Sequence, residues 1–155
     1  MELREGGLDE PQVINLLRLH MQGMLATSPV ESVHALDLSG LKSPDITFLT
    51  AWDSETLLAC GALKALGGGE GEIKSMRTAP EALRRGAGAA ILTRILEIAR
   101  ERGYSRLSLE TGTGEAFEAA HALYRRFGFD YCGSFGDYPK DDPFSRFMTI
   151  ALSTT

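Results

Sequence analysis

The stretch MRTAPEALRRGAGAA, residues 76–90, places two adjacent arginines before an alternation of glycine and alanine. A strand-like run ends within it, and an apolar helical pattern follows the arginines. The first N–H groups of a helix lack intrahelical partners and carry the positive end of the helix dipole, so such a junction attracts anions. Gly86 and Gly88 let an oxygen-rich ligand approach the backbone, while Arg84 and Arg85 add positive charge. The stretch is therefore typical of a diphosphate-binding loop.

The local charge supports a site for an anion, and the sequence does not match two familiar phosphate-binding motifs. Residues 84–106 hold six Arg and two Glu, a local excess of positive charge in a chain whose net charge is −5. The dinucleotide fingerprint requires Gly or Ala where this chain has Ile91. The run GGGEGEIKS lacks the glycine that a Walker A loop places before its lysine, because Ile73 stands there. The remaining alternative is structural, with glycines that allow close packing of helix on sheet and arginines that are solvated.

The rest of the chain alternates strand and helix patterns in α+β order, which predicts one central sheet. Strands are predicted at 1–5, 46–52, 56–66, 72–78 and 104–111, with two more strand-like runs between 129 and 152. Helices are predicted from about residue 9, at 86–103 and at 115–127. Asp9 and Gln12 have the spacing of a capping box, and Gly103 is the expected helix stop. The segment 28–41 is either a short helix or an irregular loop.

Residues 85–90, Arg-Gly-Ala-Gly-Ala-Ala, match the signature (Gln/Arg)-x-x-Gly-x-(Gly/Ala), and the sequence thereby resembles the GNAT superfamily of acyl-CoA-dependent N-acetyltransferases. The surrounding order agrees: a strand, the loop, a helix, a strand, and a helix that ends in LYRRFGF, residues 123–129. The resemblance is continuous over 72–129 and looser to Leu152. It implies a single α/β domain spanning 1–155, with a mixed, mostly antiparallel central sheet, a parallel pair splayed at the acyl-CoA site, and flanking helices.

Ile73 and Met76 break the alternation of the strand before the loop. Both are apolar, yet in a regular strand their side chains point to opposite faces. An inserted residue, a β-bulge, returns both to one face and leaves a backbone group unpaired for a ligand. The alternative is a strand covered on both faces. By resemblance to the family, a backbone N–H near Met76 stabilises the thioester oxyanion.

The resemblance implies transfer of an acetyl group from acetyl-CoA, as cosubstrate, to a primary amine by direct attack in a ternary complex. Tyr124 takes the family's general-acid position, where it protonates the departing thiolate; the alternative is a core aromatic. Glu72 and Glu110 are the candidate bases for the amine, and Glu72 is preferred because it begins the strand that leads to the thioester. Either carboxylate is alternatively a solvated or ion-paired group.

Contacts to the cosubstrate follow from the same resemblance. Main-chain contacts to pantetheine are expected at Met76 and Thr78. The pyrophosphate is expected against Arg84, Arg85, Gly86, Ala87, Gly88, Ala89 and Ala90. Many family members have Asn seven residues before the tyrosine, whereas this chain has Phe117, which either packs against the arm or belongs to the core. No metal or prosthetic group is implied.

The resemblance implies an acceptor that carries an amine and is either a small molecule or a protein. His34 and Tyr138 lie in irregular segments, which often shape binding sites, and are predicted to contact the acceptor together with Glu110. His20 and His121 are interpreted as ordinary helix residues. The β-rich tail is a candidate surface for a homodimer.

Composition sets outer limits on function. With 43% apolar and 24% charged residues the chain is typical of a globular domain, and its net charge of −5 argues against nucleic acid as a partner. Cys60 and Cys132 lack the spacing of a zinc site or a disulfide framework and are predicted to be reduced and buried. The charged start MELREGG is not a signal peptide, and no apolar run reaches the roughly 18 residues of a membrane span. These observations predict a cytoplasmic protein with no membrane partner.

Two other function classes stay open on the sequence alone. The first is a non-catalytic module that binds acyl-CoA as a sensor or regulatory subunit. The second is a dinucleotide oxidoreductase, which Ile91 and the antiparallel-looking first half disfavour. A covalent route through Cys60 or Cys132 lacks a histidine partner in the sequence.

Overall fold

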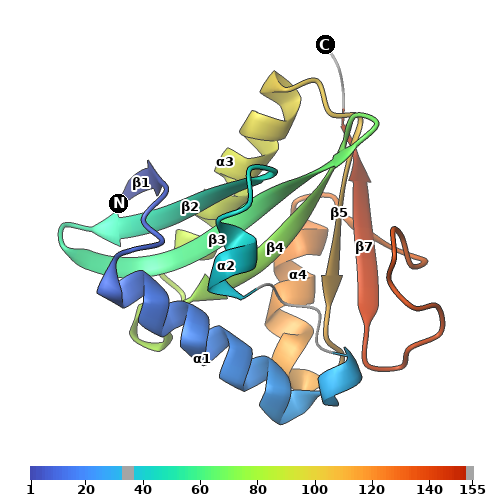
Figure 1. The fold of residues 1–155 in the computed structure, drawn as a ribbon, viewed down its shortest axis with the longest axis horizontal. Helices are drawn as coiled ribbons and strands as arrows, with labels where there is room; N and C mark the ends of the chain where they lie inside the picture. Colours follow the sequence, from blue (N-terminus) through green and yellow to red (C-terminus); the bar gives the residue numbers. More distant parts are fainter. Residues whose placement is uncertain (33–36, 153–155) are drawn as a thin grey trace.

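The computed structural model describes residues 1–32 and 37–152 and is built on a seven-stranded sheet (Figure 1). The strands lie in the order β1, β2, β3, β4, β5, β7, β6. Their bounds are Glu2–Glu5 for β1, Ile46–Asp53 for β2, Thr56–Gly67 for β3, Glu70–Thr78 for β4, Arg106–Thr111 for β5, Asp130–Cys132 for β6 and Arg146–Ala151 for β7. Neighbours are antiparallel except β4 and β5, which are parallel. The predicted mixed, mostly antiparallel sheet is confirmed.

Helices cover both faces of the sheet. They are α1 (Pro11–Thr27), α2 (Leu38–Leu41), α3 (Ala87–Glu101) and α4 (Glu118–Arg126), with 3₁₀ turns at Val30–Ser32, Pro80–Ala82 and Glu115–Phe117. In Figure 1, α1 and α2 lie in front of the sheet and α3 behind it. A Cβ added at Gly61 of β3 would meet Ile91 and Ile95 of α3, whereas Arg77 of β4 reaches Gly23 of α1. The two faces of the β3–β4 pair therefore contact different helices.

α3 is the helix that the loop pattern predicts. Its buried stripe consists of Ile91, Leu92, Ile95, Leu96 and Ala99. Gly103 has a φ of 75° and its N–H donates to the Arg100 carbonyl, while the Tyr104 N–H donates to the Ala99 carbonyl. This is the Schellman arrangement, which needs glycine at the left-handed position. The predicted stop is confirmed.

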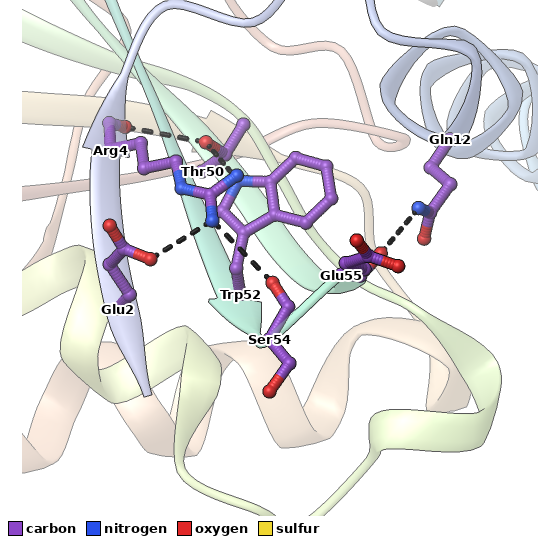
Figure 2. Close-up of polar contacts among 7 residues, drawn as sticks. All are labelled: Glu2, Arg4, Gln12, Thr50, Trp52, Ser54 and Glu55. Carbon is purple, nitrogen blue, oxygen red and sulfur yellow. Dashed lines mark hydrogen bonds and ion pairs between the residues drawn. The ribbon is translucent and has the colours of Figure 1, made fainter.

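α1 begins differently from the predicted capping box. Its N-cap is Glu10 rather than Asp9, and no side chain caps the first turn. Gln12 instead reaches the β2–β3 turn, where its Nε2 donates to the Glu55 carbonyl oxygen at 2.7 Å (Figure 2). The Leu57 N–H in turn donates to the Gln12 Oε1 at 2.9 Å. The Gln12 side chain thus makes tertiary hydrogen bonds in place of a helix cap, and these bonds attach the start of α1 to the β2–β3 turn.

The segment 28–41 contains a 3₁₀ turn, Val30–Ser32, and the short helix α2. His34 lies outside the described residues. Asp37 caps α2 by accepting a hydrogen bond from the Gly40 N–H at 2.8 Å.

The two cysteines differ in exposure. Cys60 in β3 is buried, as predicted, but the prediction for Cys132 is wrong, because that residue is exposed. Cys132 lies on β6, a three-residue edge strand whose residues are all exposed. Within residues 1–32 and 37–152, no helix is long and apolar enough to cross a membrane, and no group of three His, Cys, Asp or Glu side chains is placed to hold a metal ion.

Candidate active site

The predicted β-bulge is present in β4. The register between β3 and β4 changes between Cys60 and Ala62, where Ser75 and Met76 together oppose the single residue Gly61. Ser75 adopts a left-handed backbone with a φ of 55°. Two residues opposite one, with an irregular φ, define a bulge, so the interpretation of the broken alternation is confirmed.

The bulge turns Met76 to the face that also holds Ile73. Ile73 pairs with Leu63, which lies two residues beyond Gly61 in β3 and therefore on the same side. The Met76 side chain lies over Gly61, where an added Cβ would collide with its Sδ and would come within 2.7 Å of Ile91 Cγ2. Gly61 is thus a requirement of the bulge that the strand pattern did not reveal.

β4 and β5 pair only over the first part of β4. The register runs from Glu70 with Arg106 to Ile73 with Leu109 and stops directly before the bulge. Beyond this point the two strands diverge in Figure 1. The later part of β4 therefore has no strand partner on the side of β5, which leaves its backbone groups available to another partner.

A pocket of about 80 Å³ lies at this divergence. Its walls come from α1, β4, β5, the 3₁₀ turn with α4, and the segment between β6 and β7. The polar side chains that line it include His20, Glu72, Lys74, Ser75, Glu110 and Tyr138. The pocket thus joins the bulged backbone of β4 to titratable groups from distant parts of the chain.

The glycine-rich loop, residues 84–90, follows the C-terminal end of β4. Gly86, with a φ of 81°, is the N-cap of α3 and offers no side chain to the first turn of the helix. A Cβ at Gly88 would lie 3.4 Å from the Thr78 Oγ1 and 3.7 Å from the Leu123 Cδ2, so this turn fits closely between β4 and α4. The N–H groups of the first turn are left for a ligand or water.

Arg84 and Arg85 flank this loop in different ways. Arg84 has a left-handed backbone with a φ of 67°. Arg85 forms an exposed ion pair with Asp53, with 2.8 Å between its Nη2 and the Asp53 Oδ2. The Arg85 guanidinium is therefore held at the end of β2 in this structure.

Glu72 is ion-paired in the pocket. Lys74 Nζ lies 3.2 Å from the Glu72 Oε2, and the Tyr138 hydroxyl donates a short hydrogen bond to the same oxygen. Lys74 Nζ also donates to the Tyr138 hydroxyl oxygen at 2.8 Å. Burial and the Glu72 charge raise the pKa of Tyr138, so the phenol stays protonated. The cluster anchors the segment between β6 and β7 onto β4.

Glu110 has a raised pKa that suits it to proton transfer. It lines the same pocket from β5, and its Oε2 accepts a hydrogen bond from the Ser145 Oγ at 2.7 Å. Burial raises the pKa of Glu110 to about 7, while the Ser145 hydrogen bond and the Lys74 charge oppose this rise. A carboxyl group with this pKa takes up and releases a proton near neutral pH.

Tyr124 lines the pocket from α4 and is buried. Its ring packs edge-on against Phe129, with 5.7 Å between the ring centroids. α4 ends at Gly128, whose φ is 99°, and the Phe129 N–H donates back to the Tyr124 carbonyl. Burial raises the pKa of Tyr124, so its hydroxyl stays protonated at neutral pH.

Phe117 is half-buried and lies outside the hydrophobic core cluster of the described residues. Its ring lies against Gly112, where an added Cβ would collide with the ring, and the residue also lines the pocket. The aromatic side chain therefore packs on backbone while one side of it borders the open space.

The sequence was compared with those of known protein families. Residues 12–129 match the Acetyltransferase (GNAT) family. The chain belongs to this family. The matched region begins in α1 and ends just after α4, so it contains the bulge, the glycine-rich loop and Tyr124.

Curated relatives of this GNAT chain are similar over nearly its whole length. The uncharacterized N-acetyltransferase YsnE of Bacillus subtilis is 49% identical over 152 residues, which cover 98% of this chain and 100% of that protein. The uncharacterized N-acetyltransferase YedL of Escherichia coli is 48% identical over 97% of this chain and 94% of that protein. A protein of Azospirillum brasilense named IAA acetyltransferase is 46% identical over 80% of each chain.

Solved structures share the GNAT fold. A putative acyl-CoA N-acyltransferase of Klebsiella pneumoniae has a TM-score of 0.77 and 25% identity, covering 98% of this chain and 97% of that one. The PaiA N-acetyltransferase of Thermoplasma acidophilum, solved in complex with coenzyme A, has a TM-score of 0.72 and 16% identity, covering 98% of this chain and 100% of that one.

The fold of this GNAT chain brings six of the predicted site residues to one pocket, together with residues that were not predicted to belong to the site. The predicted residues that line it are Glu72, Met76, Glu110, Phe117, Tyr124 and Tyr138. The predicted diphosphate loop, 84–90, lies at the start of α3 instead. His20 and Ser75 also line the pocket, although no sequence pattern singled them out.

Proposed function

We propose that this protein transfers an acetyl group from acetyl-CoA to a primary amine by direct attack in a ternary complex. The observation that carries the proposal is the bulge at Ser75 and Met76, placed where β5 leaves β4 and beside a pocket with titratable groups. Membership of the GNAT family and the N-acetyltransferase names of two relatives support it.

Acetyl-CoA is proposed to lie along the open side of β4. Its pyrophosphate would bind residues 84–90, where the first turn of α3 has free N–H groups and no side-chain cap. Its pantetheine arm would follow the main chain of Met76 and Thr78 towards the pocket. Phe117 would pack against the arm in place of a hydrogen-bonding asparagine.

The reaction needs a neutral amine, stabilisation of the oxyanion, and a proton for the thiolate that leaves. In the proposed mechanism the amine nitrogen attacks the thioester carbon, the C–N bond forms and the C–S bond breaks. A backbone N–H at Met76 stabilises the oxyanion, which in comparable acyl transfers is worth about 3–4 kcal/mol. The protonated Tyr124 hydroxyl supplies a proton to the thiolate.

Glu110 is proposed as the base in preference to Glu72. Glu72 shares its carboxylate with Lys74 and Tyr138, so accepting a proton there disrupts a buried ion pair. Glu110 has a pKa raised to about 7 and a single hydrogen bond from Ser145 on one oxygen. It therefore accepts the amine proton directly or through a water molecule.

The rival function is an acyl-CoA sensor that performs no chemistry. Release of free thiol from acetyl-CoA in the presence of a panel of primary amines separates the two functions. We expect amine-dependent release by the wild type and a loss of roughly 10²–10⁴-fold in Tyr124→Phe. The control Tyr131→Phe alters an exposed tyrosine on β6 and is expected to keep wild-type turnover. Binding of acetyl-CoA with no amine-dependent thiol release would favour the sensor.

A further inference from the structure

Two buried polar atoms in the described part of the chain have no hydrogen-bond partner, and both belong to residues of the pocket. They are the Nδ1 of His20 and the Oγ of Ser75. Ser75 is only 8% exposed and sits at the bulge with a left-handed backbone. An unpaired buried polar atom is costly, so at a pocket it is satisfied by water or by a ligand that takes the place of water.

A positive charge lies near His20. Arg77 follows the bulge in β4, and its Nη1 lies 3.4 Å from the position of a Cβ on Gly23, one turn of α1 after His20. Among the described residues, no carboxylate forms an ion pair with Arg77. His20 and Ser75 thus offer hydrogen bonds within the pocket, and Arg77 adds a positive charge next to His20 from just outside the pocket's lining.

His20 is neutral at physiological pH. Burial, and then the Arg77 charge, lower the pKa of His20 to about 4. A neutral imidazole donates a hydrogen bond from one nitrogen, and a serine hydroxyl also donates one. Together with the Arg77 charge, the site matches a negatively charged oxygen.

The lining of the same pocket also carries acidic groups, Glu110 and the paired Glu72. A ligand that spans the pocket would place an amine near the carboxylates and an anionic oxygen near His20. The pocket has a volume of about 80 Å³ and is partly open, so it admits the polar end of a small molecule while a larger side chain extends through the open side. An α-amino acid, which carries an amino group and a carboxylate on the same carbon, meets both requirements.

We propose that His20, Ser75 and Arg77 form a carboxylate-binding subsite, so that the acceptor is a free amino acid. The inference rests on the proposed acetyl transfer and names the substrate class of that reaction. Glu110 receives the proton of the amino group, while the subsite holds the carboxylate and thereby orients the nitrogen towards the thioester.

The test compares each amino acid with the amine that lacks its carboxylate. Alanine, leucine and phenylalanine are paired with ethylamine, isoamylamine and phenethylamine, and thiol release from acetyl-CoA is measured for each. We expect kcat/KM to favour at least one amino acid over its paired amine by about 100-fold or more, because a site built for a polar group rejects the analogue without it. Equal or better rates with the amines would overturn the subsite and leave acetyl transfer intact.

Variants assign the preference to the named residues. His20→Phe, Ser75→Ala and Arg77→Gln are each expected to raise KM for the preferred amino acid about 10- to 100-fold, with a smaller effect on the paired amine. Arg18→Gln, on the exposed side of α1, is the matched control for Arg77→Gln. A melt with CoA verifies that each variant is folded. If the folded variants keep the wild-type preference, the subsite is wrong.

Binding separates this inference from catalysis. A thermal melt of the wild type in saturating CoA, with leucine or isoamylamine added, reports acceptor binding without turnover. Protection by the amino acid alone supports the subsite even if no acetyl transfer is found. Neither protection nor turnover with any of the three amino acids would overturn it.

Discussion

The two sides of the candidate site differ in whether backbone or side-chain groups form them. The side assigned to CoA consists mainly of backbone: the bulge at Ser75 and Met76, the start of α3, and glycines that keep side chains away. The side assigned to the acceptor consists of side chains from α1, β5 and the segment between β6 and β7. A bound thioester needs fixed N–H groups, whereas the choice of acceptor depends on charge and hydrogen bonding.

This difference predicts how the two sides respond to mutation. Substitutions of acceptor-side groups are expected to change KM, kcat or pH dependence while CoA binding is kept. Substitutions that add a side chain or a negative charge to the backbone side are expected to remove CoA binding itself. Any acceptor-side variant that abolishes CoA binding in a folded protein would break the comparison.

Glu110→Gln is expected to have the largest effect among acceptor-side changes. Loss of the base lowers kcat by roughly 10²–10⁴-fold. In the wild type, kcat/KM rises with pH through about 7, since Glu110 must lose its proton before it accepts one from the amine. The Gln variant lacks this inflection, which a pH profile of thiol release measures.

Stability measurements distinguish this effect from unfolding. The raised pKa of Glu110 means that the folded protein binds the proton more tightly than the unfolded chain does. The stability that this group contributes is complete below its unfolded pKa and is lost as the pH rises through about 7. Glu110→Gln is therefore at least as stable as the wild type at pH values above about 7. A less stable variant there would contradict the assignment of burial as the cause.

Tyr138→Phe is expected to have an intermediate effect. It removes the hydroxyl that bridges Glu72 and Lys74 but keeps the ring, which packs against Phe135 and Phe147 at centroid distances of 5.2 and 5.5 Å. Because a hydrogen bond to a charged group is lost, we expect KM for the amine to rise by about 10- to 100-fold. The affinity for CoA, measured by titration, stays at the wild-type value. A parallel loss of CoA affinity would show that this cluster serves both sides.

Arg85→Ala is expected to have the smallest effect. Its partner Asp53 is exposed, and exposed ion pairs contribute little to stability, so the melting temperature stays within about 2 °C of the wild type. If the guanidinium leaves Asp53 to bind the pyrophosphate, the affinity for CoA falls by up to about tenfold at low salt and by less at high salt. An unchanged affinity at low salt would remove Arg85 from the cosubstrate site.

The bulge in β4 and the end of α3 could be predicted from the sequence because their constraints are local. The broken alternation of Ile73 and Met76 indicated the bulge, and Gly103 indicated where α3 ends. These features depend on residues that are close in the chain, where φ preference and strand periodicity act directly.

The acceptor side was harder to predict because its contacts join distant residues. His20 is an unremarkable residue of an amphipathic helix until α1 is laid across β4, and Tyr138 meets Glu72 across 66 residues of chain. The capping box was predicted wrongly for the same reason, because the residues near Gln12 in the sequence do not indicate its hydrogen bond to Glu55. Cys132 was predicted as buried from residue type alone, whereas an edge strand left it exposed.

The most direct test of the central claim is a thermal melt with acetyl-CoA and with CoA, using the wild type and Gly88→Glu. A ligand at one hundred times its dissociation constant stabilises the folded state by about 2.7 kcal/mol. Thr93→Glu is the matched control, because it adds the same charge to an exposed position of α3 outside the loop. The account predicts that both ligands protect the wild type and the control, and that neither protects a folded Gly88→Glu. Failure of both ligands to protect the wild type would contradict it.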